Sequence, residues 1–143
     1  MALMSTAIPP LAEVKEAFAF LEDWEDRYRY IMDLGERLPV LQDADRSEAN
    51  LVHGCQSTVW LAMERQGEAV DIAADSDSKL VKGLAAVVVI ALHGCSVDQI
   101  VHFDFGGLFG ELQLHEHLSP TRSNGLHGMV QQVRSRAAEL ASG

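Results

Sequence analysis

The segment Ser57-Thr-Val-Trp-Leu-Ala-Met63 decides the fold, because large apolar side chains recur in it at every second position. A turn at Gln66-Gly67 and a second alternating run, Val70-Asp-Ile-Ala73, follow. This order predicts an antiparallel hairpin. The next residues, Asp75-Ser-Asp-Ser78, can cap a helix from about Lys79 to Leu92, and its apolar run from Gly83 to Leu92 predicts that this helix is buried.

Helical patterns precede the hairpin. Pro9-Pro10 leads into a run with apolar residues on one face from Leu11 to Leu21, and Asp23 can cap a second helix that ends before Pro39. The polar residues 42–50 then predict a connecting loop or a short helix.

Helical patterns also follow the hairpin. Ser96-Val-Asp-Gln99 matches a capping box and opens a short helix. The aromatic, glycine-interrupted stretch 103–109 is expected to be a connection, and a last amphipathic helix carries residues from Leu126 to Leu140. Helices, then strands, then helices predict an α+β fold, with a small antiparallel sheet packed against helices in one compact domain over residues 1–143, of which 1–10 are loosely ordered.

The composition excludes several classes of function. A formal net charge of −10 disfavours binding to nucleic acid or to anionic membranes, where Lys and Arg neutralise phosphates. The N-terminal residues lack the basic and long apolar regions of a signal peptide, and the longest apolar run is about half the roughly 20 residues of a membrane span. We therefore expect a cytoplasmic protein, in which free thiols stay reduced.

Cys55 is the strongest candidate for chemistry. Gly54 removes bulk from the approach to its sulfur, and polar residues follow it before the first strand begins. This places the thiol on a loop at the edge of a firm scaffold. A nucleophilic cysteine must be a thiolate and is favoured by a nearby cation or hydrogen-bond donor. His53 is the nearest candidate in sequence, and Arg122, at the expected start of the last helix, is a distant one.

Metal binding is an alternative interpretation. The tripeptide His-Gly-Cys occurs twice, so His53, Cys55, His93 and Cys95 can in principle form a tetrahedral zinc site or hold a cluster. The spacing within each pair is not one of the usual zinc patterns, however. Cys95 is more simply a small apolar residue at a helix end. His115-Glu-His117 lacks the zinc-protease spacing and is expected to lie in a solvated turn.

Four segments together resemble the SufE family of sulfur-acceptor proteins. They occur in order along most of the chain, from about residue 24 to 138, and the Gly-Cys-Gln-Ser core followed by Val-Trp is specific. The segments are Tyr30-Ile-Met-Asp-Leu-Gly-Glu-Arg-Leu-Pro39, Asn50-Leu-Val-His-Gly-Cys-Gln-Ser-Thr-Val-Trp60, Asp75-Ser-Asp-Ser-Lys-Leu-Val-Lys-Gly83 and His117-Leu-Ser-Pro-Thr-Arg-Ser-Asn-Gly-Leu126.

The resemblance implies a fold like that of IscU-type iron–sulfur scaffolds, with Cys55 as the cysteine that accepts persulfide sulfur. Arg122 matches an auxiliary arginine of the family, and His53 is a further candidate auxiliary residue. The implied partners are a cysteine desulfurase of the SufS or CsdA type, which carries its own pyridoxal phosphate, and an iron–sulfur scaffold complex that receives the sulfur. The chain would be a sulfur carrier and desulfurase activator rather than an enzyme, with no cofactor of its own.

Overall fold

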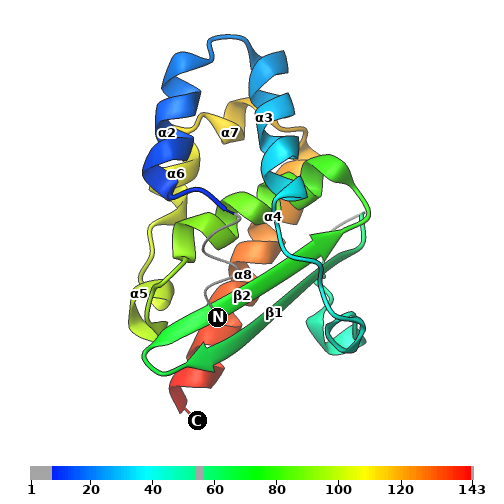
Figure 1. Ribbon diagram of the computed structural model, residues 1–143, viewed down its shortest axis with the longest axis vertical. Coiled ribbons are helices and arrows are strands. Elements are labelled where there is room, and N and C mark those ends of the chain that lie inside the picture. The colour runs from blue at the N-terminus through cyan, green and yellow to red at the C-terminus, as the bar shows by residue number, and fades with distance from the viewer. Residues whose placement is uncertain (1–7, 54–56, 143) are drawn as a thin grey trace.

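The computed structural model describes residues 8–53 and 57–142. Figure 1 shows a two-stranded sheet that crosses the long helices, with α2 and α3 side by side at one end of the molecule. The α+β prediction is confirmed. In chain order the elements are α2 (Leu11–Phe20), α3 (Trp24–Glu36), the 3-10 turns η1 (Asp43–Asp45) and η2 (Glu48–Asn50), β1 (Val59–Gln66), β2 (Ala69–Ser76), α4 (Lys79–Leu92), α5 (Val97–Val101), α6 (Phe105–Glu111), α7 (Leu114–His117) and α8 (Pro120–Ser142).

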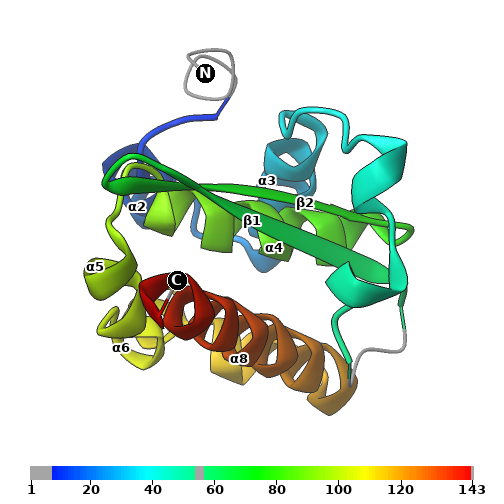
Figure 2. The same cartoon turned by 90° about the horizontal axis from the view of Figure 1, so that it is seen from below.

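The hairpin forms as its alternating pattern predicts. β1 and β2 pair antiparallel from Val59 opposite Ser76 to Gln66 opposite Ala69, and Gly67 takes a positive φ of 65° in the turn. One face of the sheet is buried, with α4 lying along β2 and α8 along β1, as Figure 2 shows from below. None of the described helices combines the length and the hydropathy of a membrane span.

Helix α4 is the centre of the core. It begins at Lys79 and ends at Leu92, and the Ser78 hydroxyl caps it by accepting a hydrogen bond from the Val81 amide at 3.4 Å. Every residue from Gly83 to Leu92 is buried. A helix that is apolar on all sides needs partners on all sides, and the sheet, α3 and α8 provide them.

Glycine lets α3 cross α4 at very short range. A Cβ atom built at Gly83 would overlap the Ile31 carbonyl group of α3, and one built at Gly35 would lie 2.8 Å from the Gly83 amide nitrogen. Side chains at either position would force the two backbones apart. The pair of glycines therefore sets the short distance between the backbones of α3 and α4 at this crossing.

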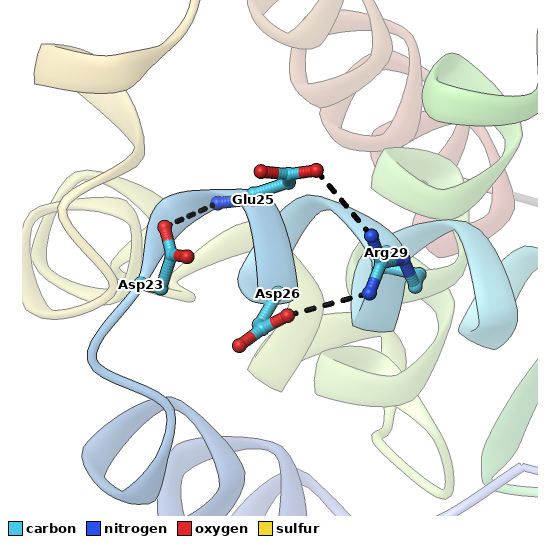
Figure 3. Close-up of polar contacts among 4 residues, drawn as sticks. All are labelled: Asp23, Glu25, Asp26 and Arg29. Carbon is cyan, nitrogen blue, oxygen red and sulfur yellow. Dashed lines mark hydrogen bonds and ion pairs between the residues drawn. The ribbon is translucent and has the colours of Figure 1, made fainter.

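Local electrostatics fix the start of α3. The Asp23 carboxylate caps the helix by accepting from the Glu25 amide at 3.1 Å, as the sequence predicts. One turn later Arg29 pairs with Glu25 at 3.5 Å and with Asp26 at 3.4 Å (Figure 3). These ion pairs lie on the surface, where such pairs contribute little to stability.

The stretch 103–109 is not the connection that the sequence analysis expects. It contains most of helix α6, whose start is capped by Asp104 accepting from the Gly107 amide at 2.9 Å. Phe105, Leu108 and Phe109 are all buried. Their spacing of three and four residues lets one helix face enter the core, and this burial outweighs the poor helix propensity of the glycines.

Candidate functional site

The described residues before and after Cys55 contact each other. The Val52 amide donates to the Val59 carbonyl at 2.9 Å, and Leu51 forms an isolated antiparallel bridge with Trp60. Cys55, the predicted nucleophile, lies in the sequence between these anchors and outside the described residues. The residues on either side of it define the surroundings of the candidate site.

The residues after Cys55 are held at the corner between β2 and α4. The Thr58 amide donates to the Asp77 carboxylate at 3.1 Å, and the Thr58 carbonyl accepts from the Ser76 hydroxyl at 2.8 Å and from the Asp77 amide at 3.3 Å. Both backbone groups of Thr58 are thus satisfied by this corner. It fixes the chain where it leaves the loop and enters β1.

The residue at the start of the loop, His53, lies against α8. Its carbonyl oxygen would be 2.8 Å from a Cβ atom built at Gly128, so glycine permits this close approach. The residue is exposed. The residue before the undescribed segment therefore lies on α8, and Thr58, after it, lies at the corner before α4.

A cavity of about 270 Å³ opens beside Ser57, two residues after Cys55. One part of its wall is apolar and comes from the start of α4 and from α8, while the other part carries hydroxyl groups and a guanidinium. Its lining residues are Ser57, Val81, Leu84, Ser119, Thr121, Arg122, Gly125 and Met129. A reactive group in such a setting has both an apolar shelter and a cation.

Arg122 supplies that cation. It lies in the first turn of α8, where the Ser119 hydroxyl caps the helix by accepting from the Arg122 amide at 3.3 Å. The residue is exposed, and its guanidinium has no hydrogen-bond or ion-pair partner among the described residues. The structure thus brings Arg122 and Ser57 to one cavity, although 65 positions separate them in the sequence (122 − 57).

His93 and Cys95 lie elsewhere. They follow the last turn of α4, whereas the cavity is lined by Val81 and Leu84 in its first half. At 1.5 Å per residue, the stretch from Val81 to Leu92 alone spans roughly 16 Å. The described residues contain no group of three or more His, Cys, Asp or Glu side chains that could hold a metal ion. The metal-binding alternative is not favoured.

The thiol of Cys95 is poorly suited to nucleophilic chemistry. Burial raises its pKa, which lowers the thiolate fraction at neutral pH. Its sulfur points to the Ala91 carbonyl at 4.0 Å, and its backbone carbonyl accepts from the Val70 amide at 3.1 Å. These contacts fit the structural role that the sequence analysis expects.

Asp75, at the end of β2, forms ion pairs with two basic side chains. Asp75 pairs with Arg46 at 2.6 Å and with Lys82 at 3.4 Å. Burial alone would raise its pKa, but the hydrogen bonds from Arg46 and from the Ser76 amide and the nearby positive charges outweigh burial and lower the pKa.

The prediction that His117 lies solvated in a turn is wrong, because its ring stacks on Trp24 at 3.9 Å between centroids.

Sequence reasoning identified Arg122 but missed the hydroxyl groups that share its cavity. Ser119 and Thr121 flank Pro120, and a serine before a proline is a recognisable helix start. That signal could have placed both residues beside Arg122 at the start of α8. Nothing in the sequence pattern brings this helix end to Ser57, since that contact depends on the tertiary packing.

Comparisons with known proteins agree with this geometry. The family model of the SufE Fe-S metabolism associated domain matches residues 12–137. A solution structure of a hypothetical protein from Thermus thermophilus has the same fold, with a TM-score of 0.77 at 21% sequence identity over 95% of this chain and 99% of that one. The model match covers most of the sequence, and the chain therefore belongs to the SufE family of domains associated with iron–sulfur metabolism.

Proposed function

We propose that the chain accepts sulfur from a cysteine desulfurase onto Cys55 and delivers it to iron–sulfur cluster assembly. The observation that carries this proposal is the cavity of about 270 Å³ that Arg122 and Ser57 line together. Cys55 is two residues from Ser57, so covalent geometry keeps their α-carbons within about 7 Å of each other. This short tether to Ser57 supports a nucleophile within reach of the cavity, where both a cation and an apolar wall are present.

The proposed reaction is a sulfur transfer between two cysteines. The Cys55 thiolate attacks the outer sulfur of the partner's cysteine persulfide, a new S–S bond forms to Cys55, and the S–S bond within the partner breaks. The partner's cysteine leaves as a thiolate and takes a proton from solvent. There is no net oxidation, and no cofactor on this chain is needed. Removal of the product sulfur frees the desulfurase for another turnover, so the chain would also activate it.

Arg122 supports the anionic states in this scheme. Both the attacking thiolate and the persulfide product carry negative charge, and a nearby guanidinium stabilises such anions relative to their protonated forms. Its lack of a partner among the described residues leaves it available for this role. His53 is a further candidate auxiliary residue, since it is exposed at the start of the same loop.

The apolar wall of the cavity would protect the Cys55 persulfide. A persulfide is lost easily to reductants and to other thiols, and Val81, Leu84 and Met129 limit the access of water and small solutes to one side of the cavity. We infer that the Cys55 persulfide is sheltered in the free protein and becomes accessible when a partner docks.

Intact-mass measurement after incubation with a cysteine desulfurase and cysteine tests the proposal. One added sulfur atom is expected on the wild-type chain and on Cys95→Ser, and none on Cys55→Ser. Peptide mapping should place the sulfur on Cys55. If Cys55→Ser still stimulates the desulfurase fully, the chain is an interaction module and the carrier function is wrong.

A further inference from the structure

We propose that Asn50 and Arg136 are positioning residues for Cys55, because together they fix the residues before it on the surface of α8. This inference rests on the proposed function, since both residues would act through the cysteine and neither is expected to touch the transferred sulfur. It concerns the described residues 49–53 and their contacts with the second half of α8.

Asn50 uses all of its polar groups to join three parts of the chain. Its side-chain oxygen accepts from Arg136 Nη1 at 3.2 Å, and its side-chain nitrogen donates to the Asp45 carbonyl at 2.9 Å. Its backbone carbonyl accepts from Gln132 Nε2 at 3.2 Å, and its backbone amide donates to the Ser47 carbonyl at 3.1 Å. A residue held at four points has one position relative to α8.

Arg136 contacts two consecutive residues of this segment. One of its terminal nitrogens donates to the Asn50 side chain, and the other donates to the Ala49 carbonyl. The planar guanidinium presents these donors in a fixed arrangement, which a lysine cannot reproduce in full. Hydrogen bonds from a charged donor are also stronger than those between neutral groups.

The contacts follow one face of α8. Gly128, Gln132 and Arg136 are four residues apart, and residues at this spacing are neighbours on a helix surface. They meet His53, Asn50 and Ala49 in turn, so the segment runs along the helix in the opposite direction. The glycine admits the backbone at one end of this face, and the arginine binds it at the other.

The same helix carries the cation of the proposed site. Arg122 and Met129 line the cavity from α8, while Arg136 and Gln132 hold the segment that leads into the loop. One continuous helix therefore positions both Arg122 and the described residues that precede Cys55. Loss of the Asn50–Arg136 contact would leave the Val52–Val59 hydrogen bond intact but would let residues 49–53 shift along α8.

The variants Asn50→Ala and Arg136→Ala test this role against a matched control, Arg134→Ala. Arg134 is on the same helix and also donates to a backbone carbonyl, that of Phe103 at 3.0 Å, but it does not contact the loop segment. We expect both test variants to accept sulfur from the desulfurase roughly tenfold more slowly than the control, because small displacements of a reacting group are costly.

A second measurement separates positioning from general destabilisation. The rate of Cys55 alkylation by iodoacetamide is followed against pH in a Cys95→Ser background. The pH midpoint should move in both test variants and stay at the wild-type value in Arg134→Ala. Arg136→Lys should restore part of the sulfur transfer rate, and the double variant should be no slower than either single variant, because the two side chains act as one contact.

The positioning role is wrong if Arg136→Ala and Asn50→Ala accept sulfur as fast as Arg134→Ala and share its alkylation profile. Failure of the proposed function would be seen in the wild-type chain itself. If the wild-type chain takes up no sulfur, the carrier function fails, while the alkylation profiles of the free protein still decide whether Asn50 and Arg136 position Cys55.

Discussion

The tripeptide His-Gly-Cys occurs at residues 53–55 and again at 93–95, and the described residues around the two copies differ in what they contact. His53, at the start of the first copy, lies against α8, and Thr58, after it, is bound by the β2–α4 corner beside a cavity whose guanidinium has no partner within the described part of the chain. The second follows the end of α4, where Gly94 has a positive φ of 78° and the Cys95 thiol is half-buried.

The difference indicates that distant elements, rather than sequence neighbours, set the surroundings of each copy. At the second copy, burial without a cation raises the pKa of the thiol. Beside the first copy, α8 brings the Arg122 cation to the cavity that Ser57 lines, and the same helix binds Asn50. If the proposed function is right, identical tripeptides have opposite reactivities.

The largest expected effect is on the two thiols themselves. Because burial raises its pKa, Cys95 should react with iodoacetamide at pH 7.5 at least about tenfold more slowly than it does in the urea-unfolded chain. Its rate should rise further with pH than that of an ordinary thiol. Peptide mapping after timed quenching measures both cysteines in one sample. Equal protection of Cys55 would remove the contrast between the copies.

The next largest effect is expected at the α3–α4 crossing. Gly83→Ala places a methyl group against the Ile31 carbonyl, and we expect the free energy of unfolding to fall by about 3 kcal/mol because two backbones must separate. Urea denaturation followed by circular dichroism measures this. The variant Gly110→Ala is the control, since a Cβ atom there meets nothing within 4 Å.

Gly83→Ala should also affect the start of α4, beside the cavity, more than its end, beside Cys95. The substitution lies beside Val81 and Leu84, which line the cavity, and is far from Cys95. Under conditions where the variant remains folded, sulfur acceptance should fall while Cys95 stays protected from alkylation. Loss of Cys95 protection with unchanged sulfur acceptance would contradict the assignment of the cavity end as the functional one.

A smaller effect, dependent on pH, is expected at Asp75. Its folded pKa is lowered, so its stabilisation is present above the unfolded pKa of about 3.9 and is lost as the pH falls through the folded value. Asp75→Asn should reduce the free energy of unfolding by about 1.5–3 kcal/mol at pH 7, the usual contribution of a hydrogen bond to a charged group. Urea denaturation at pH 7 and at decreasing pH measures the difference.

Asp75→Asn should also affect the candidate site, because the residues that follow Asp75 bind Thr58. Ser76 and Asp77 hold Thr58, so weakening the corner should also slow sulfur acceptance at pH 7. The difference in stability between wild type and Asp75→Asn should shrink once both side chains are neutral. A difference that stays constant to pH 2 would show that the ion pairs with Arg46 and Lys82 are not its source.

The smallest effect is expected at the second copy of the tripeptide. Gly94→Ala introduces a side chain at a positive φ but meets no atom within 4 Å, so the cost should be about 1 kcal/mol of unfolding free energy. Sulfur acceptance by Cys55 should be unchanged. A thermal melt and the mass assay together test this, and slower sulfur transfer in Gly94→Ala would mean that the two copies are coupled.

Much of the fold could be predicted because its signals are local. The Ser78 cap, the apolar run of α4 and the alternating strands are each contained in fewer than about 15 residues, which is the range over which periodicity can be read. Helix α6 was missed for a physical reason. Its three glycines oppose helix formation locally, and only the burial of Phe105, Leu108 and Phe109 makes the helix favourable.

The site was predictable only in part. Cys55 and Arg122 stand out through unusual sequence neighbours and through resemblance to a family, and the family is confirmed. The contacts of Asn50 with Gln132 and Arg136 join residues more than 80 positions apart, and no local pattern marks such a pair. Likewise, Ser57 shares a cavity with Arg122 because α4 and α8 pack together, which is a property of the assembled core.

The hydrogen bond between Val52 and Val59 has a consequence for evolution and engineering. It joins the residues before and after the segment that contains Cys55, so the greatest distance that the cysteine could reach depends on the number of residues between them. Because both ends are fixed, each inserted residue would extend that reach by about 1.7 Å, half of its extended length, whereas even doubling the length of a flexible loop costs only about 0.6 kcal/mol. Small insertions would therefore change the reach of the proposed nucleophile without redesign of the surrounding scaffold.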